Sequence, residues 1–105
     1  MTERVTRVVV GHRAYRVDWA PVDDSSDGEF LARRGVVRVD PDGDEGHLAE
    51  VLMHELLHVL VHDSGLSLPE PQEEQVVSAL APRLLDFLSR NPRCAAWLIA
   101  AGSSF

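Results

Sequence analysis

A five-residue run, HELLH at positions 54–58, places two imidazoles and a carboxylate at a spacing that could perform hydrolysis. On a helix, residues four positions apart lie on one face, so His54 and His58 can bind the same metal ion. Glu55 would then lie beside a water molecule held by that ion. A catalytic zinc lowers the pKa of such a water to about 7, and the neighbouring carboxylate can accept its proton. The run therefore predicts metal-assisted hydrolysis of a peptide or amide bond.

The residues around this run predict a largely buried helix with one polar stripe. Residues 48–61 are apolar except at positions 50, 54, 55 and 58, and these four polar side chains fall in one sector of a helix together with His62. Solvent-facing stripes are usually built from Lys, Arg and Glu, whereas this stripe carries three histidines. The stripe therefore favours a polar cleft over the alternative, an ordinary amphipathic helix whose wet face happens to carry histidines.

A catalytic zinc needs a third protein ligand besides two histidines, with its fourth position left open for water. His62 lies about 12 Å of helix rise beyond the first histidine, too far to share the ion, and a hydrogen bond to a nearby carboxylate or carbonyl is the role we expect for it. Position 64, where a metzincin would carry its third histidine, is Ser64. Glu73 and Glu74 remain, and periodicity slightly favours Glu73 without deciding between them.

The elements that must position these residues divide the chain into a strand-rich part, residues 1–43, and a helical part, residues 44–105, which together predict an α+β fold. Residues 5–10 and 14–19 are rich in β-branched side chains and predict a hairpin. Residues 30–32 and 36–40 predict two further short strands. An acidic loop is expected between the two pairs, over residues 21–29.

Three helices are expected in the second part. Asp44 is a suitable N-cap for the motif helix, and Gly65 a suitable stop at its C-terminus. Ser67 and Glu70 have capping-box spacing at the start of a second helix that reaches position 88, which Pro82 should kink or divide. A short last helix is expected after position 91.

Length and composition predict one domain over residues 1–105. The net charge is −7 and all ten cations are arginine, a balance that argues against nucleic-acid binding because that relies on basic patches. The single cysteine, Cys94, excludes an internal disulfide and is expected to be a buried thiol. The sequence shows no signal-peptide pattern and no apolar stretch of about 20 residues, so we expect a cytoplasmic protein with no membrane partner.

Residues 54–62 and 74–85 together resemble the HExxH helix and the glutamate helix of small gluzincin-type zinc metallopeptidases. The group they resemble most is the ImmA/IrrE-like group, with the minimal phage and prophage metallopeptidases related to it. The resemblance covers about residues 48–90 and implies a zincin-like fold, in which a small antiparallel or mixed sheet precedes the two helices. Ser78, where asparagine is common, and Pro82 depart from the pattern of the group.

The resemblance also implies a ligand set and a catalytic group. It places Zn²⁺ on His54, His58 and Glu74, with Glu55 as the catalytic base. The function it implies is a zinc metallopeptidase, an endopeptidase more than an exopeptidase, acting on a peptide or on one specific protein in a phage or regulatory setting. A zinc-binding interaction module with a peptidase-like fold and little or no hydrolysis is the open alternative, although a purely structural site has no need of Glu55.

Two parts of the predicted site are less defined by the sequence. Residues 36–40 are expected to form the edge strand along which an extended peptide pairs. Tyr15, His12 and His62 are the candidates for stabilising the oxyanion, and none is favoured. Tyr15 is expected to be a strand residue with an exposed hydroxyl, and His12 and His47 to be surface residues. The oligomeric state is not predicted.

Overall fold

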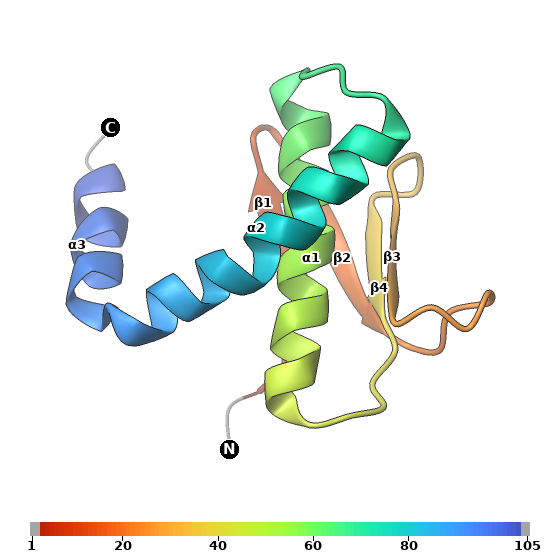
Figure 1. The fold of residues 1–105 in the computed structure, drawn as a ribbon, viewed down its shortest axis with the longest axis horizontal. Coiled ribbons are helices and arrows are strands. Elements are labelled where there is room, and N and C mark those ends of the chain that lie inside the picture. Colours follow the sequence, from red (N-terminus) through yellow and green to blue (C-terminus); the bar gives the residue numbers. More distant parts are fainter. Residues whose placement is uncertain (1–2, 104–105) are drawn as a thin grey trace.

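Figure 1 shows the computed structural model, which describes residues 3–103 as a small sheet, one helix packed on it and two further helices. The strands are β1 (Arg7–Val10), β2 (Arg13–Trp19), β3 (Gly28–Leu31) and β4 (Val36–Val39). The helices are α1 (Glu45–Ser64), α2 (Glu70–Arg90) and α3 (Pro92–Gly102). This confirms the predicted α+β class and the order of a sheet followed by helices.

The sheet is mixed, with the strand order β1-β2-β4-β3. β1 and β2 form the predicted antiparallel hairpin, in which Arg7 lies opposite Arg16 and Val10 opposite Arg13. β3 and β4 are also antiparallel, whereas β2 and β4 run parallel. Because β4 returns between β2 and β3, the strand nearest to the helices in sequence lies inside the sheet and β3 lies at its edge.

The prediction that residues 36–40 form the edge strand is therefore wrong. Val36, Val37 and Val39 are all buried, and Val37 and Val39 are inaccessible to solvent. β4 pairs with β2 on one side and with β3 on the other, so neither of its edges is free within the described strands. β3 takes the position that was expected for residues 36–40.

The main core lies between α1 and the inner face of the sheet. It contains a cluster of fully buried side chains, which are Tyr15, Val37, Val39, Leu48 and Val59. The prediction of an exposed Tyr15 hydroxyl is wrong, because only 2% of this residue is accessible to solvent and its ring packs edge-on against Phe30. Tyr15 is thus a packing residue that helps to seat α1 on the sheet.

Both ends of α1 lie at the capping residues that the sequence predicts, whereas the start of α2 does not. Asp44 accepts a hydrogen bond from the His47 amide and caps α1, and Gly65 ends the helix in the left-handed conformation, as predicted. The capping box of Ser67 and Glu70 is wrong. α2 begins at Glu70 with Pro69 as its N-cap residue, and no side chain caps it.

Ser67 lies outside α2, because residues 66–69 are not helical and Pro69, with φ −56° and ψ 145°, is the N-cap residue. Pro82 does not divide α2, which runs as one helix from position 70 to position 90. The last predicted helix is confirmed as α3.

α2 crosses α1 and then continues beyond the sheet, so that its C-terminal end and α3 extend away from the rest of the structure (Figure 1). Within residues 3–103, α2 is the only helix or strand against which α3 packs. The prediction of a buried Cys94 is wrong for this reason, since α3 leaves the thiol exposed. Among the described helices, none has both the length and the apolar character that crossing a bilayer requires.

Candidate metal centre

Two helices bring the predicted ligands together. α1 presents His54 and His58 on one face, and α2, reversed by the turn at Gly65, presents Glu74 opposite them. One nitrogen of each ring and one oxygen of the carboxylate lie within 4.8 Å of one another. These three residues could therefore hold a metal ion, and this is the ligand set that the resemblance implied.

The distances within this group are slightly shorter than those between the ligands of a small divalent ion. Glu74 Oε1 lies 2.9 Å from His54 Nε2, and Glu74 Oε2 lies 2.9 Å from His58 Nε2. Ligand bonds of about 2.0–2.1 Å in a tetrahedron hold their atoms about 3.3 Å apart, so small side-chain movements would admit an ion. Ser78, one turn further along α2, donates a hydrogen bond to Glu74 Oε1 and orients the carboxylate.

Glu73 hydrogen bonds to the second nitrogen of the His58 ring, Nδ1. Its Oε2 lies 2.6 Å from His58 Nδ1, while His58 Nε2 faces Glu74. Burial alone would lower the pKa of His58, but the hydrogen bonds to the two carboxylates outweigh it and raise that pKa. A carboxylate on the far nitrogen of a ligand histidine fixes the tautomer that offers its other nitrogen to a metal.

The two neighbouring glutamates therefore have different roles, which periodicity could not separate. Glu74 faces both histidines, and Glu73 contacts only His58 among them. Burial would raise the pKa of Glu74, but the charges of His54 and His58 and the Ser78 hydroxyl lower it. Glu74 is thus held as a carboxylate, the form that a metal requires.

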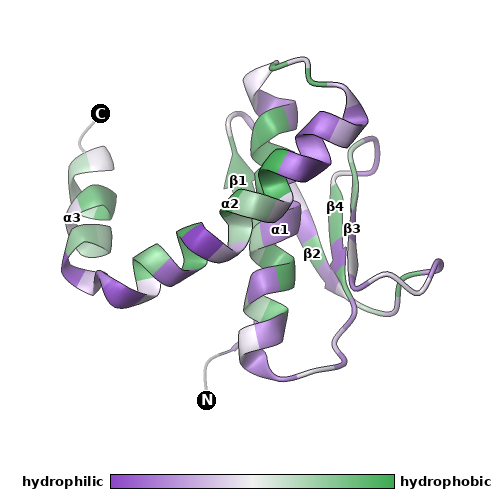
Figure 2. Ribbon diagram, in the orientation of Figure 1, coloured by the Kyte–Doolittle hydropathy of each residue, from purple (hydrophilic) through white to green (hydrophobic). Residues whose placement is uncertain are grey.

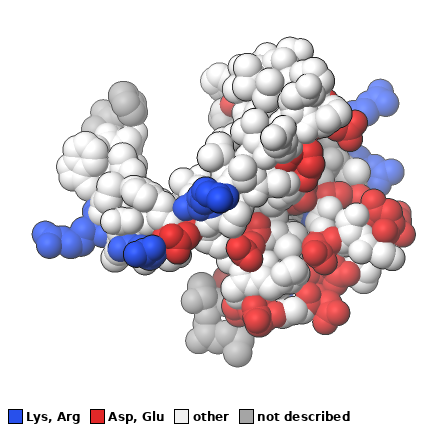
Figure 3. Space-filling view, viewed as in Figure 1, with Lys and Arg blue, Asp and Glu red and all other residues white. Residues whose placement is uncertain are grey.

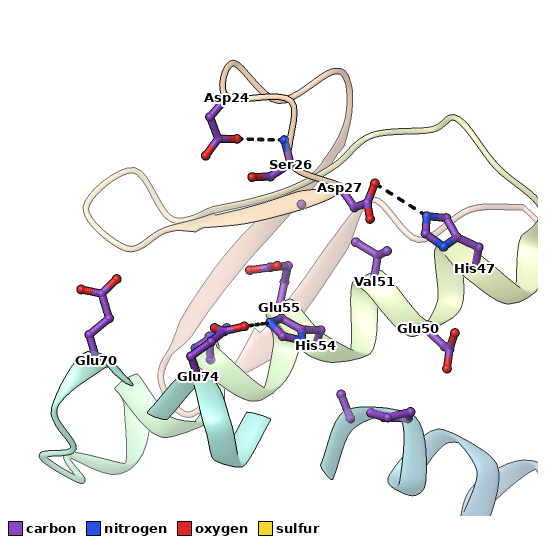
Figure 4. Close-up of a pocket in the computed structure, with 14 residues that line it drawn as sticks. Asp24, Ser26, Asp27, His47, Glu50, Val51, His54, Glu55, Glu70 and Glu74 are labelled. Carbon is purple, nitrogen blue, oxygen red and sulfur yellow. Dashed lines mark hydrogen bonds and ion pairs between the residues drawn. The ribbon is translucent and has the colours of Figure 1, made fainter. Parts of the chain in front are cut away.

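Glu55 is the buried carboxylate of the site, and 8% of its surface is accessible. The residues described in positions 3–103 give its side chain no hydrogen bond and no ion pair, yet it lines the cleft beside the two histidines (Figure 4). Burial raises its pKa to about 7, helped by the negative charges of Glu74 and Glu29 and opposed by His58. An unpaired carboxyl group that titrates near neutrality is suited to accept and return a proton.

Gly28 at the start of β3 leaves the space for this carboxyl group. A Cβ atom there would lie 2.8 Å from Val51 Cγ1 and 3.1 Å from Glu55 Cγ. Both contacts are closer than packed carbon atoms allow. A glycine at position 28 therefore lets the edge strand lie directly on the helix face that carries Glu55, a requirement that the sequence analysis missed.

A cleft of about 640 Å³ opens beside the ligands, between α1, α2 and the loop before β3 (Figure 4). Its lining includes six carboxylates, which are Asp24, Asp27, Glu50, Glu55, Glu70 and Glu74. No arginine is among the described residues that line it. Hydrogen bonds from Ser26 lower the pKa of Asp24, which is therefore ionised. Figure 3 shows acidic side chains gathered on this side of the molecule.

The structure does not bring the other sequence candidates into the cleft. His12 is exposed in the turn between β1 and β2, Tyr15 is in the core, and the His62 ring packs edge-on against Phe30. No hydrogen bond to the His62 ring is present within residues 3–103, so the role predicted for it is wrong. His47 is partly exposed, as expected of a surface residue, and it also lines the cleft, 3.9 Å from Asp27.

No protein-family model, curated protein or solved structure matches this chain. The geometry of the ligands, the buried glutamate and the cleft is therefore what supports a function.

Replacing Glu73 by alanine should weaken zinc binding about 10- to 100-fold without abolishing it, because His58 loses the carboxylate that orients its ring. Competition with a chromophoric chelator at pH 7.5 measures this affinity. Glu70→Ala is the matched control, since Glu70 lines the same cleft but contacts neither ligand histidine. Equal losses in the two variants would mean that Glu73 acts through its charge alone.

Glu55 should destabilise the metal-free protein above neutral pH. Its pKa is about 7 in the folded protein and 4.5 ordinarily, so the folded state binds the extra proton and the free energy of unfolding falls as pH rises between these values. Glu55→Gln should therefore gain about 2–3 kcal/mol over wild type between pH 5 and pH 8. Urea denaturation with a chelator present measures the gain.

Glu50→Gln serves as the control for this comparison, because Glu50 lies on the same helix and is exposed. Its difference from wild type should be the same at both pH values. A flat difference for Glu55→Gln as well would show that Glu55 is not the buried, proton-binding group described here.

Proposed function

We propose that this protein is a zinc-dependent metallopeptidase with a zincin-like fold. The observation that carries the proposal is the convergence of His54, His58 and Glu74 from two helices beside a buried Glu55 that has no partner of its own among the described residues. A purely structural zinc site closes its fourth position with another ligand and needs no base. Here three ligands face an open cleft, which is the arrangement that catalysis requires.

Zinc is the metal proposed, because two imidazoles and one carboxylate are a ligand set that suits it and that leaves one position open. When bound, zinc supplies a Lewis acid that polarises the scissile carbonyl and lowers the pKa of the attacking water. The Glu73 carboxylate, which accepts a hydrogen bond from His58 Nδ1, and the Ser78 hydroxyl, which donates one to Glu74, would keep the ligands oriented.

Glu55 would move the proton during hydrolysis. Its carboxylate accepts a proton from the attacking water and then donates it to the nitrogen of the leaving amine. In the metal-free protein burial raises the pKa of Glu55 to about 7. A bound metal ion would lower that pKa and favour the carboxylate that accepts the proton. Because no arginine or hydroxyl group is bonded to it within residues 3–103, nothing in that part of the chain competes for the carboxylate.

The free edge of β3 is the proposed position of the peptide. Among the described strands, β3 pairs only with β4, so its other edge is open to an added strand. β3 begins at Gly28, which lines the cleft, and the strand packs against α1. A peptide paired with β3 would thus pass close to Glu55 and the metal ligands.

The charge of the cleft favours a cationic peptide. Glu50 and Glu70 have no ion pair within residues 3–103, and Asp27 faces only His47 at 3.9 Å. Two positive charges of a bound metal would leave most of the six carboxylates uncompensated. Arginine or lysine side chains beside the scissile bond would supply the missing charge.

A peptide library derived from a whole proteome tests the activity and the preference together, with cleavage sites read by mass spectrometry. Zinc-loaded wild-type protein should cut next to arginine or lysine more often than next to acidic residues. Glu55→Gln should retain one zinc per chain and lose about 100- to 10,000-fold in cleavage rate. The double variant Glu50→Gln with Glu70→Gln should retain the cleavage activity and show a weaker preference for basic residues.

Two outcomes would contradict the proposal. Equal cleavage by wild type and Glu55→Gln would attribute the activity to a contaminant. Stoichiometric zinc in wild type without any cleavage would instead favour a zinc-binding interaction module.

A further inference from the structure

The last part of the chain forms an arm that is separate from the metal centre. We define the arm as residues 83–102, which are the C-terminal end of α2 and all of α3. Figure 1 shows it extending away from the sheet and α1. Within the described chain, α3 packs against α2 and against no strand, and none of its residues is buried.

The arm exposes large apolar side chains. Trp97 and Ile99 are 67% and 72% accessible, and Leu98 between them is also exposed. Residues 94–101 of α3 are all apolar, and Figure 2 colours part of this helix green. A helix that is apolar on all sides is normally buried, so its exposure in a single copy is unusual.

The apolar surface continues from the arm along α2. Val77 and Ala81 are almost fully buried, whereas Val76, Leu80 and Leu84 on the adjoining stripe are exposed. Phe87 extends this stripe into the arm and is exposed as well. The apolar face of α2 is therefore wider than the part that the rest of the chain covers.

The amount of exposed apolar surface matches a protein interface. Seven side chains contribute to it, which are Val76, Leu80, Leu84, Phe87, Trp97, Leu98 and Ile99. Together they leave on the order of 800 Å² accessible, about what one partner contributes to an interface of standard size.

The charges of the arm and of the rest of the molecule are opposite. The arm carries three arginines, Arg83, Arg90 and Arg93, and one acid, Asp86. The rest of the chain holds sixteen of the seventeen acidic residues and seven of the ten arginines. Figure 3 shows basic side chains along the arm and acidic ones on the body. A second copy of this chain thus offers the arm a surface of opposite charge.

From these observations we infer that the protein forms a homodimer in which the arm of each copy packs on the other copy. The apolar stripe on α2 of one copy covers α3 of the other, and the basic residues of each arm face the acidic body of its partner. Such an exchange is reciprocal, so a two-fold axis buries both arms at once. The inference does not depend on the proposed peptidase activity, because it rests on residues outside the metal centre.

Sedimentation velocity over a micromolar concentration series tests the dimer on the full chain. Wild type should sediment as a dimer. The double variant Trp97→Glu with Ile99→Glu should raise the dimer dissociation constant at least about 100-fold, because large side chains at an interface centre carry most of the binding energy. Val9→Glu is the matched control, since Val9 is an exposed apolar residue on β1. It should leave the dimer intact.

Circular dichroism and zinc content should be unchanged in the arm variant, which separates loss of the dimer from loss of the fold. Monomeric wild type throughout the series would overturn the inference, as would a dimer that survives the arm substitutions. Monomeric wild type that pellets with anionic phosphatidylserine vesicles would also overturn it and would assign the apolar arm to a membrane surface.

Discussion

The register between α1 and α2 is the constraint on which the candidate metal centre depends. The two histidines are fixed relative to each other by one helical turn, but Glu74 reaches them only because α2 packs against α1 at one position along its length. Gly65 reverses the chain in the left-handed conformation, and the buried Val77 and Ala81 hold α2 in place after the reversal. If α2 were shifted by one residue along α1, a neighbouring residue of α2 would face the two histidines in place of Glu74.

The same register creates an electrostatic imbalance that a metal ion would relieve. Three carboxylates, those of Glu55, Glu73 and Glu74, are grouped around two imidazoles, and Glu55 is left buried without a bond within residues 3–103. The hydrogen bonds to Glu73 and Glu74 raise the pKa of His58 in the metal-free protein. Because a metal binds the neutral form of a histidine, metal binding should weaken as pH falls.

The parts of this arrangement that follow from local chemistry could be predicted from the sequence. Helical periodicity placed His54 and His58 on one face, and the caps at Asp44 and Gly65 fixed the ends of the helix that carries them. Periodicity could not choose between Glu73 and Glu74, because neighbouring residues differ by about 100° on a helix and only the packing of α1 against α2 decides which one faces the histidines.

Properties set by distant parts of the chain were missed. The order of β3 and β4 in the sheet, the burial of Tyr15 and the exposure of Cys94 each depend on which elements become neighbours in space. Gly28 illustrates the same point, because its contacts with Val51 and Glu55 join a strand to a helix more than twenty positions away. The first residue of α2 was missed as well, since the helix begins at Glu70 and Ser67 lies outside it.

Metal content by mass spectrometry is the measurement that tests the central claim most directly. On protein prepared without an affinity tag and incubated with zinc, wild type and Glu70→Ala should each retain one zinc per chain, whereas His58→Ala and Glu74→Ala should retain none. Wild type without stoichiometric metal, or full retention by Glu74→Ala, would contradict the assignment of His54, His58 and Glu74 as the ligands of a metal centre.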